Sequence, residues 1–185
     1  KDYSFSRKVN LFKKELYNKS IIDVGCGKGD FLKSIIDKYK YKSLTGLDVS
    51  LPDEKVQNHF KEINFIKKDV TEFELNEKFD VVYSNHVFEH MSPVDVDTHL
   101  KSIVKCLKSD GTLILNSPNE LFGPSDVTRI IDFSYTNKMK AQGSHLNEST
   151  YSKIIPILKK HGFKSFKSPF PHTIIRHLIS SFRLN

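Results

Sequence analysis

The stretch that decides the fold of this 185-residue chain is I-I-D-V-G-C-G-K-G-D-F-L, residues Ile21–Leu32. A β-branched apolar run ends in three glycines at alternate positions, Gly25, Gly27 and Gly29, and apolar residues then recur at helical spacing. The pattern predicts a buried strand, a tight turn and a helix. Glycines in the turn let the backbone bend sharply and let a ligand lie against the main chain. Asp23, just before the turn, can face a cationic ligand group.

The spacing of this turn separates it from phosphate-binding loops. A dinucleotide site usually reads G-x-G-x-x-G and a Walker A loop ends in G-K-[ST], whereas this turn reads D-x-G-x-G-x-G. Asp48 closes a second apolar run 23 residues after Gly25, where doubly wound folds bind a ribose diol. The two features together predict a nucleoside ligand without a phosphate group, and S-adenosylmethionine fits that description. The turn taken alone would also suit another nucleotide-binding Rossmann-like protein.

Five segments together resemble successive motifs of the class I S-adenosylmethionine-dependent methyltransferases. They are the glycine turn, L-D-V-S at Leu47–Ser50, K-D-V at Lys68–Val70, F-D-V-V-Y-S-N-H-V-F-E-H at Phe79–His90 and L-K-S-D-G-T-L-I-L at Leu107–Leu115. The resemblance covers residues 15–168 in the family's order and spacing. It implies a Rossmann-like, doubly wound α/β fold with a mostly parallel, seven-stranded type of sheet and helices on both faces.

The resemblance also implies which residues bind the donor S-adenosylmethionine. These cofactor-binding candidates are Asp23, Gly25, Cys26, Gly27, Asp48, Asp69, Val70 and Asn85. The glycines would pack on the methionine part, with Asp23 near its amino end and Asn85 closing that side. Asp48 would bind the ribose hydroxyls, and Asp69 would face the adenine amine beside the Val70 backbone. Asp80, at the start of its strand, is expected to be structural.

The acceptor side is predicted from the histidines around Asn85–His90. His86, Glu89 and His90 would share one helical face, and His145 follows in a later loop. The segment resembles the E-x-x-E-H motif with which quinone O-methyltransferases and small-RNA 2′-O-methyltransferases bind a divalent metal, although His86 replaces the first acid. Glu89, His90 and His145 are therefore metal-ligand candidates, and two imidazoles with a carboxylate suit Mn²⁺, Fe²⁺ or Zn²⁺ better than Mg²⁺. The alternatives are a metal-free site with His90 or His145 as the base, and a structural or substrate-contact role.

Strands alternate with helices along the chain, which predicts a mostly parallel sheet covered on both faces. The expected strands lie near 20–25, 43–48, 62–67, 79–84, 111–116 and 163–168. The expected helices lie near 3–18, 29–39, 53–60, 95–107 and 148–161. Ligands of such sheets bind at the carboxyl ends of the strands, where every motif falls.

The chain is interpreted as a single domain, 1–185, with two additional segments. Residues 117–147 form a long connection that is expected to be a lid over the site. Its S-P-N-x-x-x-G-P-x-D-V stretch resembles methyltransferases of bacterial glycan assembly and so favours a sugar hydroxyl as acceptor. The C-terminal extension, 170–185, is compatible with a membrane-surface helix, a last strand or a packing helix.

Composition bounds these hypotheses. The net charge is +7, but the lysines are spread along the chain and there is no arginine-rich tract, which favours a solvated surface over an RNA-binding face. Two distant cysteines suggest neither a disulfide framework nor a zinc pair, and Lys1–Ser4 contain no signal-peptide hydrophobic region, so a cytoplasmic protein is expected. The remaining histidines are expected at the surface: His59, His99, His161, His172 and His177.

The sequence thus predicts a class I methyltransferase that acts on a hydroxyl group of a sugar, a glycan or another small metabolite. The first alternative is a metal-assisted RNA 2′-O-methyltransferase, which the positive charge and the E-H…H pattern favour. The second is a catalytically silent subunit that binds S-adenosylmethionine within a complex. The oligomeric state is left open.

Overall fold

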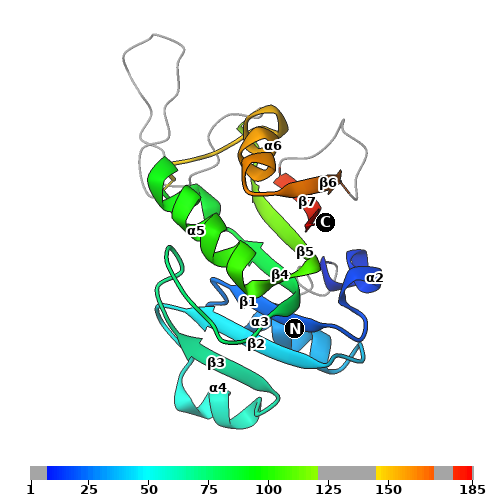
Figure 1. The fold of residues 1–185 in the computed structure, drawn as a ribbon. Helices are drawn as coiled ribbons and strands as arrows, with labels where there is room; N and C mark the ends of the chain where they lie inside the picture. Colours follow the sequence, from blue (N-terminus) through cyan, green and yellow to red (C-terminus); the bar gives the residue numbers. More distant parts are fainter. Residues whose placement is uncertain (1–7, 121–144, 169–176, 185) are drawn as a thin grey trace.

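The computed structural model describes residues 8–120, 145–168 and 177–184. Within them, one seven-stranded sheet has the order β3-β2-β1-β4-β5-β7-β6 (Figure 1). Strands β1 to β5 are parallel, and β7 is antiparallel to both β5 and β6. The strands are β1 (Ser20–Val24), β2 (Ser43–Asp48), β3 (Ile63–Lys67), β4 (Phe79–Asn85), β5 (Leu107–Pro118), β6 (Phe163–Lys167) and β7 (His177–Leu184). The predicted doubly wound α/β class is confirmed.

Two apolar clusters cover the two faces of the sheet. One joins side chains of β1, β4 and β5 to helices α5 (Pro93–Cys106) and α6 (Tyr151–Lys160). The other joins the opposite sides of the same strands to α2 (Lys13–Leu16) and α3 (Asp30–Ile36) (Figure 1). Helix α4 (Glu54–His59) buries no side chain, and η1 (Phe88–His90) is a single 3₁₀ turn after β4. None of the described helices combines the length and the apolar character needed to cross a membrane.

Side-chain caps determine where helices α5 and α4 begin. Helix α5 begins two residues earlier than predicted because Ser92 and Asp95 form a capping box and Pro93 occupies the first turn. Asp53 caps α4 by accepting a hydrogen bond from the backbone N–H of Val56. Of the predicted helix over 3–18, the described part is helical at 8–11 and over α2.

The C-terminal segment needs a correction. Residues 177–184 form β7, which lies between β5 and β6 inside the sheet. The membrane-surface helix considered for 170–185 is therefore wrong for these residues, while the possibility of a last strand is confirmed for them. Residues 170–176 and 185 lie outside the described residues, as does most of the proposed lid, 121–144.

Asp80 ties three central strands together at the amino end of the sheet. Its carboxylate accepts hydrogen bonds from the Ser20 backbone N–H at 2.8 Å, the Ser20 hydroxyl at 2.7 Å and the Lys108 ammonium at 2.9 Å. Burial alone would raise the pKa of Asp80, but these donors outweigh it and hold the pKa well below its usual range. Asp80 is thus a strand clamp, in agreement with the structural role expected from the sequence.

We expect Asp80→Asn to lower the free energy of unfolding at pH 7 by about 1–3 kcal/mol, because charge-assisted hydrogen bonds are lost. A depressed pKa adds stability that is fully present above the ordinary carboxyl pKa of about 3.9 and is lost progressively as the pH falls from there through the depressed pKa. Urea unfolding should therefore show a difference at pH 7 that narrows toward pH 3. Asp110→Asn, at an exposed carboxylate, is the control. An equal effect of both variants would contradict the clamp.

Candidate active site

The glycine turn is held against the carboxyl end of β2. The backbone N–H of Gly25 donates to the Leu47 carbonyl at 2.8 Å, and that of Gly27 donates to Asp48 Oδ2 at 2.8 Å. Both glycines have positive φ, +82° and +50°, which disfavours any other residue. A Cβ at Gly25 would clash with the Val87 side chain, whereas one at Gly27 would meet no atom within 4 Å. The turn is therefore packed at its base and open at Gly27.

A cavity of about 230 Å³ lies on this open side, at the carboxyl ends of β1 and β4. Its walls combine the turn with Asp23, Phe31, Tyr83 and Asn85. The Phe31 and Tyr83 rings stack with centroids 3.6 Å apart, which forms a rigid aromatic wall. A larger hollow of about 670 Å³ lies along the edge strand β3 and includes none of the predicted site residues. The smaller cavity is therefore the candidate donor site.

Two buried polar groups in the cavity wall have no hydrogen-bond partner among the described residues: Asp23 Oδ1 and the Tyr83 hydroxyl. Burial, reinforced by the negative charge of Asp48 and opposed by Lys8, raises the pKa of Asp23 to about 8. Burial and the Asp23 charge also raise the pKa of Tyr83. Since buried polar groups normally have partners, these two atoms indicate a ligand that supplies hydrogen-bond donors, such as an ammonium group.

Of the other predicted donor-binding residues, Cys26 lines the cavity and Asp48 contacts the turn, whereas Asp69 and Val70 follow β3 and are not among the residues that line the cavity. Asp48 accepts hydrogen bonds from the backbone N–H groups of Gly27 and Ser50, so its carboxylate shapes the turn. Cys26 lines the cavity, and its thiol lies near Gly46, where an added Cβ would be only 2.9 Å from the sulfur. Asp69 accepts from the Thr71 backbone N–H and hydroxyl, and these bonds lower its pKa.

His99 corrects the expectation that it lies at the surface. It is fully buried, and its Nδ1 lies 2.6 Å from the Val70 carbonyl. Burial lowers the pKa of His99 to about 4, so the neutral ring donates this hydrogen bond at physiological pH. On the same helix, the Ser102 hydroxyl accepts from the Phe73 backbone N–H. Helix α5 thereby holds the loop predicted to meet the adenine.

The other histidines follow a mixed pattern. His59 is exposed, as predicted. His161 is a second correction, because its side chain is 7% exposed and lies 3.0 Å from an Asp97 carboxylate oxygen. His172 lies outside the described residues, as does the side chain of His177.

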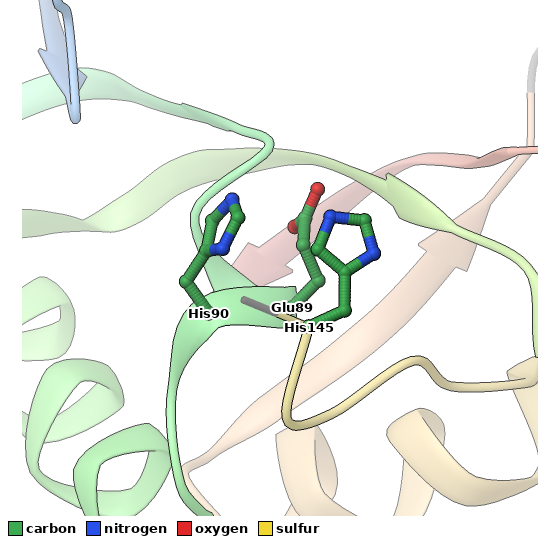
Figure 2. A group of neighbouring side chains, drawn as sticks. All are labelled: Glu89, His90 and His145. Atoms are coloured by element: carbon green, nitrogen blue, oxygen red, sulfur yellow. The ribbon is translucent and has the colours of Figure 1, made fainter. Parts of the chain in front are cut away.

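Three of the four predicted acceptor-side residues form one cluster: Glu89, His90 and His145. Each offers a ligand atom, and the three atoms lie within 4.8 Å of one another. Figure 2 shows the Glu89 carboxylate between the two imidazole rings, whose centroids are 5.0 Å apart. Glu89 and His90 come from η1, directly after β4, and His145 comes from the segment before α6. Residues far apart in the sequence thus come together beside β4, the strand whose Tyr83 and Asn85 line the donor cavity.

Further hydrogen bonds orient this cluster. His86, at a strained φ of +56°, places Nδ1 2.7 Å from Glu89 Oε1, so it supports Glu89 from outside the three-residue group. The Ser117 hydroxyl donates to Glu89 Oε2 at 3.3 Å. Glu148 Oε1 lies 2.7 Å from His145 Nδ1. Sequence reasoning missed Glu148, although the H-x-x-E spacing was a usable signal.

The main chain also joins the two parts of the cluster. The Glu89 carbonyl accepts hydrogen bonds from the backbone N–H groups of Leu146 at 2.6 Å and Asn147 at 3.0 Å. His145 is therefore positioned by a backbone contact to its partner residue as well as by Glu148. Because Glu89 is fully buried, its charge needs the nearby imidazoles or a cation as compensation.

Comparisons with known proteins identify the family of this chain. The sequence pattern of a family described as a methyltransferase domain matches residues 2–167. The chain is 36% identical to malonyl-[acyl-carrier protein] O-methyltransferase of Acetivibrio thermocellus over 101 residues, and this match covers 52% of the chain. It is 29% identical over 161 residues, 83% of the chain, to ubiquinone biosynthesis O-methyltransferase of Pelagibacter ubique. The chain spans 35% and 65% of the length of these two relatives.

A solved structure shows the same fold. It is 1,6-didemethyltoxoflavin-N1-methyltransferase of Burkholderia thailandensis with bound S-adenosylhomocysteine. The TM-score is 0.68 at 19% sequence identity, and the match covers 99% of this chain and 79% of that chain.

The buried Asp23 gives a pH-dependent prediction for donor binding. With a pKa of about 8, Asp23 is largely protonated in the free protein at pH 6.5, and an ammonium group beside it would favour the ionised form. We expect the affinity for S-adenosylhomocysteine to rise between pH 6 and 8. Calorimetry in buffers of different ionisation enthalpy should show release of up to about one proton per ligand at pH 6.5. Asp23→Asn should abolish the release, and an unchanged release in that variant would contradict the assignment.

Proposed function

Because this chain belongs to the methyltransferase-domain family, we propose that it transfers a methyl group from S-adenosylmethionine to a hydroxyl oxygen of a sugar, a glycan or another small metabolite. The observation that carries this proposal is that Glu89 and His90, directly after β4, form a cluster with His145 from the segment before α6. The same strand ends in Tyr83 and Asn85, which line the donor cavity. Donor and acceptor chemistry thus meet at one strand end.

The donor side supplies position and charge. Asp23 and the Asn85 region would hold the methionine part, Asp48 would bind the ribose hydroxyls, and the Asp69–Val70 loop would hold the adenine. Methyl transfer is a direct displacement in which the carbon–sulfur bond breaks as the carbon–oxygen bond forms. The sulfonium loses its positive charge and leaves as S-adenosylhomocysteine. Catalysis therefore depends on holding the two reactants in line and on removing the hydroxyl proton.

The histidine cluster can receive that proton. His145, oriented through Nδ1 by Glu148, would act as the base, and the His90 ring lies next to it. The buried Glu89 carboxylate stabilises the imidazolium that forms. A hydroxyl proton transferred to the imidazole leaves an alkoxide-like oxygen to attack the methyl group.

The same three side chains suit a divalent cation. Two imidazoles and one carboxylate are ligands of Mn²⁺, Fe²⁺ or Zn²⁺, and Glu148 hydrogen-bonded to the far nitrogen of His145 is the outer contact that such histidines usually have. When bound, such a cation would lower the pKa of the acceptor hydroxyl.

An oxygen acceptor is supported by the relatives, since both curated proteins compared above are named O-methyltransferases. The preference for a sugar depends on the 117–147 segment, of which 121–144 lie outside the described residues. A metal-assisted RNA 2′-O-methyltransferase is the second candidate, because the net charge is +7 and the ligand-competent cluster is formed. The labelling experiment below therefore measures methyl transfer to RNA in a separate fraction.

We expect His145→Gln to lower the rate of methyl transfer by about 10²- to 10⁴-fold, the usual contribution of a positioned base. The affinity for S-adenosylhomocysteine should stay within about twofold, because His145 does not line the donor cavity. His59→Gln, at an exposed position on α4, is the matched control. Retained transfer in His145→Gln would remove this residue from the chemistry.

The acceptor class can be tested with radiolabelled methyl-S-adenosylmethionine and a fractionated cell extract, with and without a chelator. Label in sugar, glycan or small-metabolite fractions supports the proposal. Loss of that label when the chelator is present would show that transfer also requires a metal ion. Label in RNA that disappears when the chelator is present would contradict the proposal and support the metal-assisted RNA 2′-O-methyltransferase. Donor binding without label in any fraction would indicate a catalytically silent subunit. His145→Gln serves as the background in each fraction.

A further inference from the structure

Helix α5 grips the loop that follows β3 through two side chains on one helix face. His99 Nδ1 donates a hydrogen bond of 2.6 Å to the Val70 carbonyl. The Ser102 hydroxyl accepts one of 3.0 Å from the Phe73 backbone N–H. Residues three apart on a helix point to the same side, so both bonds belong to a single contact between helix and loop. The His99 bond is the one that reaches the predicted adenine-binding residues.

The loop itself begins as a tight turn beside the carboxyl end of β2. The Lys68 backbone N–H donates to the Asp48 carbonyl at 3.1 Å. Asp69 Oδ1 then accepts hydrogen bonds from the Thr71 backbone N–H at 2.8 Å and from the Thr71 hydroxyl at 2.7 Å. The turn is thus closed by its own side chains, and His99 adds support from outside by holding the carbonyl of the residue between them, Val70.

An imidazole is a costly side chain for the place that His99 occupies. It is fully buried, with the Phe73 and Phe88 rings edge-on at centroid distances of 6.4 and 6.0 Å. Its Nε2 is buried and has no hydrogen-bond partner among the described residues. An apolar side chain would fill such surroundings without an unpartnered nitrogen. The hydrogen bond to Val70 is the described contact that accounts for a histidine here.

The groups that this bond orients can distinguish one purine from another. At its six-membered ring, adenine offers an amine donor at C6 and an acceptor at N1, whereas hypoxanthine offers a carbonyl oxygen and an N–H. The Asp69 carboxylate accepts hydrogen bonds and the Val70 backbone N–H donates one. This pair of groups complements adenine, and it opposes hypoxanthine at both positions. A site with fixed polar groups rejects a ligand that leaves them unpaired.

We propose that His99 is a positioning residue for base selectivity: by holding the Val70 carbonyl, it fixes the Asp69–Val70 backbone in the orientation that accepts adenine and rejects hypoxanthine. The inference rests on the proposed function, because it takes an S-adenosyl compound as the donor. His99 acts through Val70 and not by touching the base. Its removal should therefore reduce the discrimination between the two bases more than the stability of the fold.

The test is calorimetry with S-adenosylhomocysteine and S-inosylhomocysteine, which differ only in the base. We expect the unmodified protein to bind the adenine compound about tenfold or more tightly, the range for lost or opposed hydrogen bonds. His99→Leu should narrow this preference to about threefold or less, because the Val70 carbonyl loses its donor. His99→Asn, whose amide N–H lies close to the position of Nδ1, should keep most of the preference. A purely structural role would weaken both ligands equally and leave the ratio unchanged.

His161→Leu is the matched control, since this nearly buried histidine contacts Asp97 and not the loop, and it should leave the ratio unchanged. Thermal unfolding shows whether each variant is folded. If His99→Leu does not fold, His99→Gln takes its place, because its amide extends past the position of Nδ1 and should lose the preference that His99→Asn keeps. An unchanged ratio in these variants, or no preference in the unmodified protein, would overturn the inference while the donor site stands. If the unmodified protein binds neither ligand, the proposed function itself fails.

Discussion

The rest of the site depends on how the glycine turn is pinned between β2 and the residues after β4. Gly25 leaves room for the Val87 side chain, and its N–H is held by the Leu47 carbonyl. Gly27 turns its N–H toward Asp48 and leaves the space above it open. A side chain at Gly25 would displace Val87 and, with it, the start of the segment that carries Glu89 and His90. The donor cavity and the acceptor cluster therefore share one packing constraint.

The site also depends on how the charges of its buried acidic side chains are balanced. Glu89 is fully buried, and the side chain of Glu148 is nearly so, yet their described partners are imidazoles and a hydroxyl. Asp23 is also buried, and its carboxylate carries a raised pKa. Placing acids in such surroundings costs stability unless a proton, a cation or a ligand compensates them. Both ends of the site thus favour positively charged or proton-donating partners, which matches a sulfonium donor and a hydroxyl acceptor.

Local patterns predicted the parallel sheet and the glycine turn well, because apolar runs and glycine spacing act over short stretches. The three residues of the Glu89–His90–His145 cluster were also predicted, but the hydrogen bonds that orient them were not. Glu148, Ser117 and the Glu89 carbonyl act through contacts that only the folded chain brings together. The burial of His99 was missed for the same reason, because a lone histidine in an amphipathic helix has no distinctive spacing. The β7 strand was left open because its apolar residues suit either secondary structure.

The central claim is that the cavity at the glycine turn and the Glu89–His90–His145 cluster form one active site. A crystal structure with S-adenosylhomocysteine and Mn²⁺, with anomalous data collected for the metal, tests it most directly. The account predicts the ligand in the cavity beside Asp23 and Tyr83, with its sulfur directed toward the cluster, and any ordered Mn²⁺ between the three side chains. Ligand bound in the hollow along β3, or with its sulfur directed away from Glu89 and His145, would contradict it.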